Sequence, residues 1–195
     1  MGKSLTVLSA KALPLLRDNI DTDAIIPSRE IKGVTKTGLA DGLFAGWRYT
    51  GARELNPDFL LNWPQFSGVQ ILLSGANFGC GSSREQAVWA LVEYGFRVIV
   101  AESFGEIFYN NCIVNGVLPI QLSKKKIARL VKIDGDIKVD LVEQTIAGTE
   151  FNISAPHKHM LVQGLDAIDI TMESISEIEL FEQNYFANNP WIQLK

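Results

Sequence analysis

A glycine-rich turn constrains this chain more than any other stretch, because it lies between a predicted strand and a predicted helix. The apolar run at 69–73 is short and branched, as is typical of a buried strand. After the turn, apolar residues recur at helical spacing from Ala87 to Tyr94. We expect this helix to begin at Ser82 or Ser83 and to direct its unpaired N–H groups into the turn at 74–86, which favours an anion there.

Ser82 in this turn allows two interpretations. Ser82 and Glu85 have the S-x-x-E spacing of a capping box, in which the serine hydroxyl only completes the start of a helix. The alternative is a catalytic serine, and on spacing alone the cap is favoured because catalytic serines are rare. Arg84 opposes the helix dipole in the first turn, which indicates another role, such as a bidentate clamp on a carboxylate. The turn matches neither the phosphate-loop nor the dinucleotide pattern, so nucleotide binding is not supported.

The net charge, the apolar content and the few cysteines and histidines of the chain argue against several classes of function. A net charge of -4, with no basic run beyond 124–126, argues against nucleic acid as a partner. No stretch has the apolar length of a signal peptide or a membrane span, so we expect a cytoplasmic protein without a membrane partner. The two cysteines, Cys80 and Cys112, lie far apart, and the two histidines, His157 and His159, add little, so we expect no metal site in this chain.

The remaining sequence predicts a single α/β domain over residues 1–195. A second buried strand at 96–101 completes a strand, helix and strand unit, whose two strands should be parallel. Residues 28–68 are interrupted repeatedly by glycine and proline and are too long for a plain connection, so we expect a lid or a binding loop. The acidic, amphipathic tail at 173–195 is expected to form a helix at the surface or on a partner.

Shorter patterns predict further elements. The aspartate-rich segment at 18–23 should form a tight turn, and it lacks the glycine and the closing glutamate of a calcium-binding EF-hand. Turns are expected at 110–112 and 115–116, and a hairpin should pair 137–142 with 149–153. A helix from His157 should end at Gly164, the usual residue at this position.

Several motifs, taken together and in order, resemble those of one enzyme family. The resemblance is to the small subunits of 3-isopropylmalate dehydratase, in the aconitase superfamily, and it covers nearly the whole chain. The motifs that carry it are Asp18-Asn19-Ile20-Asp21-Thr22-Asp23 with the following Ala24-Ile25-Ile26-Pro27, Asn77-Phe78-Gly79-Cys80-Gly81-Ser82-Ser83-Arg84-Glu85, and residues 164–171, with further matches at 43–49, 104–111 and 115–119.

This resemblance implies a fold, a partner and a reaction. The fold would be a swivelling α/β domain with a mixed β-sheet, in β/β/α layers flanked by helices. The domain would dock as part of a heterodimer onto a large subunit that carries a [4Fe-4S] cluster on three cysteines, and it would be inactive alone. The complex would be a hydro-lyase of leucine biosynthesis that isomerises a 2-hydroxy diacid, 2-isopropylmalate, to 3-isopropylmalate by dehydration and rehydration.

The resemblance also assigns roles to individual residues. Ser82 matches the serine that removes a proton as an alkoxide, while Ser83 and Arg84 match contacts to a substrate carboxylate. Asn77 and Gly81, in the same motif, are further substrate-binding candidates. Because no histidine lies near Ser82 in sequence, its alkoxide would depend on the amides of the glycine turn, the helix dipole and Arg84, as in an oxyanion hole.

Two positions depart from the family pattern. Gln86 replaces the usual histidine, which we expect to alter packing rather than chemistry. Glu30-Ile31 replaces an aromatic residue followed by leucine in the loop that lines the side-chain pocket of the substrate. Glu30 should therefore face solvent or Lys32, or the substrate carries a smaller or more polar group, such as the methyl of citramalate, because a buried unpaired carboxylate is costly.

Two alternatives to the main hypothesis stay open at this point. One is a related hydro-lyase subunit acting on citramalate, homocitrate or another 2-hydroxy diacid. The other is a homologue that binds a small ligand without catalysing a reaction.

Overall fold

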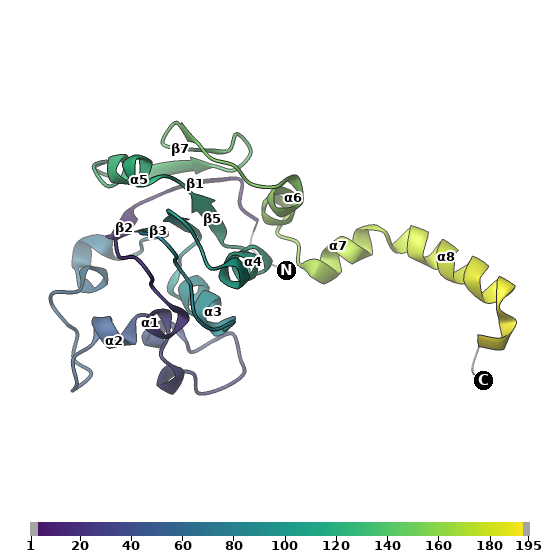
Figure 1. Ribbon diagram of the computed structural model, residues 1–195, viewed down its shortest axis with the longest axis horizontal. Coiled ribbons are helices and arrows are strands. Elements are labelled where there is room, and N and C mark those ends of the chain that lie inside the picture. The colour runs from purple at the N-terminus through teal and green to yellow at the C-terminus, as the bar shows by residue number, and fades with distance from the viewer. Residues whose placement is uncertain (1–3, 193–195) are drawn as a thin grey trace.

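The computed structural model describes residues 4–192, which form two four-stranded sheets and helices on both sides of them (Figure 1). The strands are β1 Val7–Ala10, β2 Ala12–Leu15, β3 Ile71–Ser74, β4 Val98–Ala101, β5 Leu118–Gln121, β6 Ile137–Asp140, β7 Thr145–Ile146 and β8 Thr149–Glu150. The helices are α1 Thr22–Ile25, α2 Ala45–Arg48, α3 Gln86–Tyr94, α4 Glu106–Val114, α5 Lys124–Leu130, α6 Ala155–Gln163, α7 Ala167–Glu173 and α8 Ile175–Asn188.

The two sheets differ in strand direction. Strands β2, β3, β4 and β5 lie in this order and are all parallel, whereas β1, β6, β7 and β8 form an antiparallel sheet. Only Lys11 separates β1 from β2, so one extended segment supplies an edge strand to each sheet. The mixture of parallel and antiparallel strands predicted for the fold is confirmed, and it is divided between two sheets.

The parallel sheet is the middle layer, and its strands are apolar on both faces for this reason. Leu72 and Ile99 face a core shared with α3, α4 and the 28–68 segment. Their neighbours Ile71 and Val98 face a second core, which the antiparallel sheet, α5 and α6 complete. The molecule therefore has the β/β/α layers expected from the family resemblance, with the middle layer buried between two hydrophobic cores.

The 28–68 segment folds against α3 by means of short helical turns. It contains α2 and the 3-10 helices Ser28–Glu30, Ala40–Gly42, Leu60–Asn62 and Pro64–Phe66. Glu93 on α3 fixes residues 38–40 of this segment. Its carboxylate accepts hydrogen bonds from the backbone N–H groups of Gly38, Leu39 and Ala40 at 2.6, 2.5 and 2.9 Å. The segment is thus ordered by side chains of the core domain and not by regular sheet pairing.

The chain ends in an arm that leaves the layered body. Figure 1 shows α7 and α8 extending away from the sheets beyond α6. Helix α6 ends as predicted at Gly164, whose φ of +72° is left-handed. The helix predicted for the tail is present as α8, and residues 193–195 of the predicted tail lie outside the described residues. We refer to residues 166–192 as the C-terminal arm.

Three local predictions are wrong. Helix α3 begins at Gln86, not at Ser82 or Ser83. Residues 110–112 lie inside α4, because Phe108 and Cys112 pack into the core and tertiary packing overrides the local preference of asparagine for turns. The hairpin is β7–β8, closed by Ala147 and Gly148 with φ of +46° and +73°, as a tight two-residue turn requires, and β6 pairs with β7 and β1 instead of residues 149–153.

Within residues 4–192, no helix combines the length and the apolar character needed to span a membrane.

Candidate active site

The glycine-rich turn, residues 75–85, lies where three parallel strands end. On one side, the N–H groups of Gly79 and Thr22 donate to the carbonyls of Ile20 and Cys80 at 2.7 and 2.9 Å. On the other side, the N–H of Phe78 donates to the carbonyl of Ser103 at 3.0 Å. The segments after β2, β3 and β4 are therefore joined side by side at the carboxyl edge of the sheet, the edge where open α/β sheets bind ligands.

Two glycines of the turn are required by its backbone. Gly79 has a φ of +74°, and the ring of Phe108 occupies the space where a Cβ atom would lie. Gly81 has a φ of +94° and faces Asp21 and Thr22. A side chain at either position would strain the turn and displace the segment that follows it, which carries Ser82.

Ser82 is exposed, and its hydroxyl lies 2.9 Å from the hydroxyl of Thr22 on α1. The backbone N–H of Ser82 also donates to Thr22 Oγ1, at 3.2 Å. Because Thr22 Oγ1 accepts this bond, its own hydrogen can be donated to Ser82 Oγ. Thr22 is only 2% exposed. It stands at the start of α1, which Asp21 caps by accepting from the N–H of Ala24 at 2.7 Å. Thr22 is the partner of Ser82 that the sequence analysis did not select.

The capping-box interpretation of Ser82 is wrong. The residue before the first turn of α3 is Glu85, and no side chain caps this helix. The Glu85 carboxylate accepts from the side-chain amide of Asn115 at 2.8 Å instead of reaching back to Ser82. Since Ser82 lies before the helix, and the field of a helix dipole falls off within its first turn, the dipole of α3 contributes little at the hydroxyl.

Arg84 is held by an acidic residue of the same chain. Its two terminal nitrogens donate to the two carboxylate oxygens of Asp23, at 2.5 and 3.2 Å. This hydrogen-bonded pairing with Arg84 lowers the pKa of Asp23, and Ser28, which donates to the same carboxylate, contributes a smaller part. A guanidinium has five N–H donors, so three remain after this pairing, and the side chain of Arg84 is 27% exposed. Asp23 belongs to a motif that the sequence analysis singled out, but its pairing with Arg84 was not predicted.

The other predicted substrate-binding residues of the turn lie at the same edge. Asn77 takes a left-handed φ of +58°, donates its backbone N–H to Ser103 Oγ at 2.8 Å and donates its side-chain amide to Asn19 Oδ1 at 2.8 Å. These bonds hold the turn to its two neighbouring segments. Gly81 and Ser83 are exposed beside Ser82.

Glu30 neither faces solvent nor pairs with Lys32, contrary to the first expectation for this residue. Its side chain is 8% exposed, and both carboxylate oxygens accept from Nη1 of Arg53, at 2.9 and 3.0 Å. The adjacent Ile31 is partly buried against the core next to α3. The structure therefore removes the cost of an unpaired buried carboxylate by an ion pair within the 28–68 segment.

The cysteines of this chain do not form the donor set of an iron–sulfur cluster. Cys112 is fully buried in the core, which raises the pKa of its thiol well above the ordinary value. Cys80 is partly exposed in the turn. Among residues 4–192 no group of three cysteine, histidine or acidic side chains is arranged to hold a metal ion.

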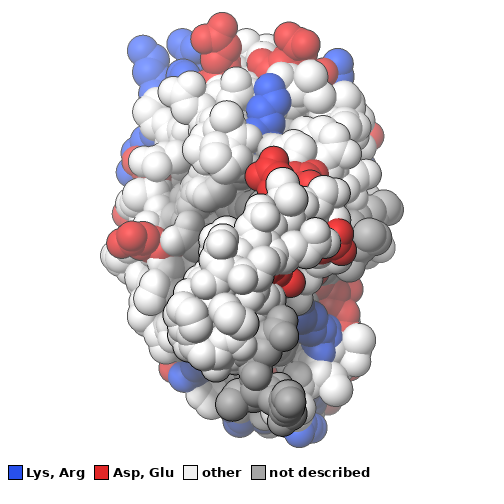
Figure 2. All heavy atoms as spheres, turned by 90° about the vertical axis from the view of Figure 1, so that its right-hand side faces the viewer, with Lys and Arg blue, Asp and Glu red and all other residues white. Residues whose placement is uncertain are grey.

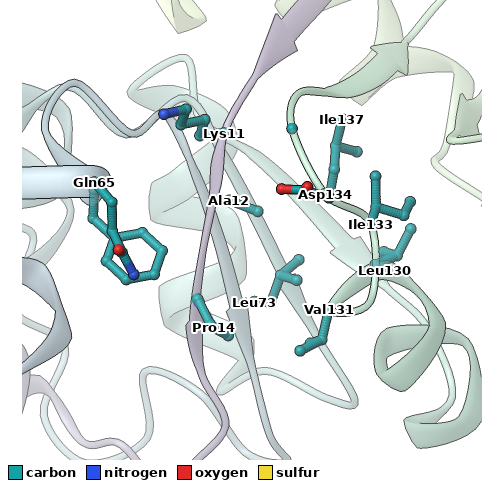
Figure 3. Close-up of a pocket in the computed structure, with 12 residues that line it drawn as sticks. Lys11, Ala12, Pro14, Gln65, Leu73, Leu130, Val131, Ile133, Asp134 and Ile137 are labelled. Carbon is teal, nitrogen blue, oxygen red and sulfur yellow. The ribbon is translucent and has the colours of Figure 1, made fainter.

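A separate hollow of about 500 Å³ is lined by none of residues 75–85. As Figure 3 shows, it lies between strand β2 and the segment from Leu130 to Ile137, with Gln65 on the opposite side. Its walls are mainly apolar, with Lys11 and Asp134 as the charged residues among them. It contains none of the residues that the sequence analysis selected for function.

Comparison with known sequences identifies relatives over nearly the whole chain. Residues 3–125 match the family model described as the aconitase C-terminal domain. A 3-isopropylmalate dehydratase small subunit from Cupriavidus necator is 47% identical, with 93% of each chain covered. Small subunits of the same name from Neisseria gonorrhoeae and Oenococcus oeni are 44% and 46% identical, over 97% and 93% of this chain and 98% and 96% of the relatives.

A solved structure has the same fold. The crystal structure of a 3-isopropylmalate dehydratase from Methanocaldococcus jannaschii matches with a TM-score of 0.63 and 26% identity, covering 92% of this chain and 99% of that one. The order of motifs along the sequence, the layered fold and these matches agree with one another. The chain belongs to the family of 3-isopropylmalate dehydratase small subunits, which share the aconitase C-terminal domain.

Proposed function

We propose that this chain is the small subunit of a 3-isopropylmalate dehydratase and supplies the base that starts the reaction. The relatives that carry this name match it over nearly their full length. The observation that carries the chemical part of the proposal is the exposed Ser82 hydroxyl, which contacts Thr22 and lies two residues from a paired arginine.

In this proposal Ser82 acts as an alkoxide. It takes a proton from the carbon next to the one that bears the substrate hydroxyl, and the electron pair of the broken C–H bond forms a C=C bond. The hydroxyl leaves as hydroxide. Hydroxide then adds to the neighbouring carbon, while Ser82 returns its proton to the carbon that lost the hydroxyl. The product is 3-isopropylmalate, with the same atoms as the substrate.

The difficulty in this step is the high pKa of a serine hydroxyl, and the site offers two groups that reduce it. A hydrogen bond donated by Thr22 stabilises the negative charge on Ser82 Oγ. Arg84 places a permanent positive charge near the same edge. With three N–H donors left, Arg84 can bind a substrate carboxylate while Asp23 continues to hold its orientation. Asn77, Gly81 and Ser83 would complete the substrate contacts.

The remaining chemistry is assigned to the large subunit. That partner would carry the [4Fe-4S] cluster, which would supply Lewis-acid chemistry toward the hydroxyl and one carboxylate of the substrate. The exposed turn would be covered when the two subunits meet, so that water is excluded from Ser82. Cytoplasmic location and 2-isopropylmalate as the preferred substrate are parts of the same proposal.

A second substrate has one specific observation in its favour. Glu30 and Arg53 place an ion pair in the 28–68 segment, at the position where relatives are expected to have an apolar pocket. A smaller diacid such as citramalate would need less apolar contact there. We favour 2-isopropylmalate, the isomer of 3-isopropylmalate, because the near-full-length relatives are named 3-isopropylmalate dehydratase small subunits.

The test is reconstitution of the purified chain with a cluster-loaded large subunit. Turnover of 2-isopropylmalate, citramalate and homocitrate is measured by the ultraviolet absorbance of the unsaturated intermediate. We expect 2-isopropylmalate to have the highest kcat/KM and Ser82→Ala to lower kcat by roughly 10²- to 10⁴-fold, as removal of a positioned base does. Ser9→Ala, an exposed serine on β1, is the matched control and should retain activity. Full activity of Ser82→Ala would show that Ser82 is not the base.

A further inference from the structure

Within the C-terminal arm, α7 contacts the body through Ile170, which packs against the second core, and through Glu173, whose carboxylate lies 3.1 Å from His159 Nε2. Helix α8 has almost no such support. Helix α8 has no buried residue along its 14 positions. A helix of this length is marginal in water unless another surface packs against it. The arm is joined to the body through α7, which begins at a capping box formed by Asp166 and Asp169. We therefore expect a partner surface to stabilise the helical form of α8.

One side of α8 presents a stripe of large apolar side chains. The stripe consists of Ile175, Ile178, Phe181 and Tyr185, whose spacing of three and four residues places them on one helix face. Phe181 and Tyr185 are 64% and 41% exposed, and their rings stack at 5.6 Å. Exposed aromatic residues in a continuous apolar row mark a surface that binds another protein.

The charge of the arm identifies the kind of surface that fits it. Residues 166–192 contain six acidic side chains and no lysine or arginine. In Figure 2, where the arm points toward the viewer, its surface is white and red. Two arms packed together would place like charges beside each other, which opposes pairing with a second copy. A complementary surface has an apolar groove bordered by lysine and arginine.

We propose that the apolar stripe of α8 binds a basic-rimmed apolar groove on the large subunit. This inference rests on the function proposed above, which supplies a large subunit as the partner. It adds an attachment point outside the catalytic edge, in the mode by which an amphipathic helix enters a groove. In the isolated chain α8 is then mostly unfolded, and it becomes helical on assembly.

The experiment compares full-length variants for binding to the large subunit by calorimetry. Phe181→Ser with Tyr185→Ser should weaken the Kd at least tenfold, while Gln183→Ser, the same residue introduced away from the stripe, should change it less than twofold. The thermal midpoint of both variants should equal that of the unchanged chain, because α8 lies outside the core. Glu177→Gln with Glu182→Gln should reduce the salt dependence of the Kd.

Hydrogen exchange and sedimentation complete the test. Amides 175–188 should be protected in the complex and exchange rapidly in the isolated chain. The inference is overturned by an unchanged Kd for the double variant, by protection of these amides in the isolated monomer, or by a dimer of the isolated chain that depends on Phe181. Turnover by the complex of the unchanged chain with its large subunit is measured separately. Absence of turnover in that complex would contradict the proposed function, whereas the Kd values would still test the binding site of α8.

Discussion

The hydroxyl oxygens of Thr22 and Ser82 lie 2.9 Å apart, although the residues are sixty positions apart in sequence. The contact joins the start of α1 to the glycine-rich turn, and Thr22 also accepts the backbone N–H of Ser82. A buried threonine thus fixes both the position and the hydrogen-bonding environment of the exposed serine. This arrangement makes Thr22 a positioning residue with a measurable contribution to the proposed reaction.

Two substitutions of Thr22 distinguish the effect of its hydroxyl from the effect of its side-chain volume. Thr22→Val keeps the shape but removes the hydrogen bond to Ser82, so kcat of the reconstituted complex should fall by about tenfold, equivalent to about 1.4 kcal/mol. Thr22→Ser keeps the hydroxyl and should recover most of the activity. The rise of kcat with pH should also move to higher pH in Thr22→Val. Equal activity of the valine and serine variants would contradict the role.

The Asp23 and Arg84 pair should make stability depend on acid pH. Since the pairing lowers the pKa of Asp23 in the folded chain, its contribution is complete above the ordinary value of about 3.8 and is lost as pH falls through the lower folded pKa. The difference in urea stability between the unchanged chain and Asp23→Asn should therefore be present at pH 7 and shrink below pH 4. Persistence of the full difference at pH 2 would rule out this linkage.

Asp23 should also affect substrate binding through Arg84. With the carboxylate replaced in Asp23→Asn, Arg84 loses its fixed orientation, and KM for the diacid should rise by roughly tenfold with a smaller change in kcat. Asp58→Asn, the same change at an exposed site away from the turn, is the control and should leave KM unchanged. A lower KM in Asp23→Asn would mean that Asp23 competes with the substrate for Arg84.

The ion pair between Glu30 and Arg53 should contribute more to stability than the contact of Glu30 with the exposed Arg29. Arg53→Ala leaves the largely buried Glu30 carboxylate without its main partner, and should lower the free energy of unfolding by about 2 kcal/mol. Arg29, 3.6 Å from the same carboxylate and 68% exposed, provides the control, and Arg29→Ala should change stability by less than about 0.5 kcal/mol. Chemical denaturation of both variants makes the comparison, and similar losses would contradict it.

Glu93→Gln should loosen the 28–68 segment. Burial would raise the pKa of this carboxyl, but the three N–H groups from residues 38–40 outweigh it and hold the pKa below its ordinary value. A neutral amide oxygen accepts these bonds more weakly, so stability should fall by about 1 kcal/mol and amides 38–40 should exchange faster. Glu54→Gln in the same segment, with an exposed side chain, is the control. Unchanged hydrogen-exchange rates at amides 38–40 would show that the Glu93 carboxylate does not hold these residues in place.

The repeating patterns of the sequence predicted the body of the fold well. The buried strands, the helix after the glycine turn and the stop at Gly164 follow from apolar periodicity and from glycine conformation, which are local properties. Local reasoning failed where a distant residue decides the outcome. The side-chain amide of Asn115 donates to the Glu85 carboxylate, which the capping box would have used. Helix α4 includes two asparagines because Cys112, which follows them, packs into the core.

The site shows the same division. The place of the glycine-rich turn between β3 and α3 was predictable from the apolar run before it and the helical spacing after it. The contacts within the site were not, since Thr22 with Ser82, Asp23 with Arg84 and Glu30 with Arg53 each join segments that only the folded chain brings together. The roles of these residues in catalysis remain proposals that the substitutions above address.

The backbone hydrogen bonds on both flanks of the glycine turn have a consequence for how the complex opens. They attach Ser82, Thr22 and Arg84 to one rigid body, so the three groups travel together and keep their mutual geometry. In the proposed complex, we therefore expect a diacid to be admitted by movement of this whole body relative to the large subunit, with the contacts inside the turn kept.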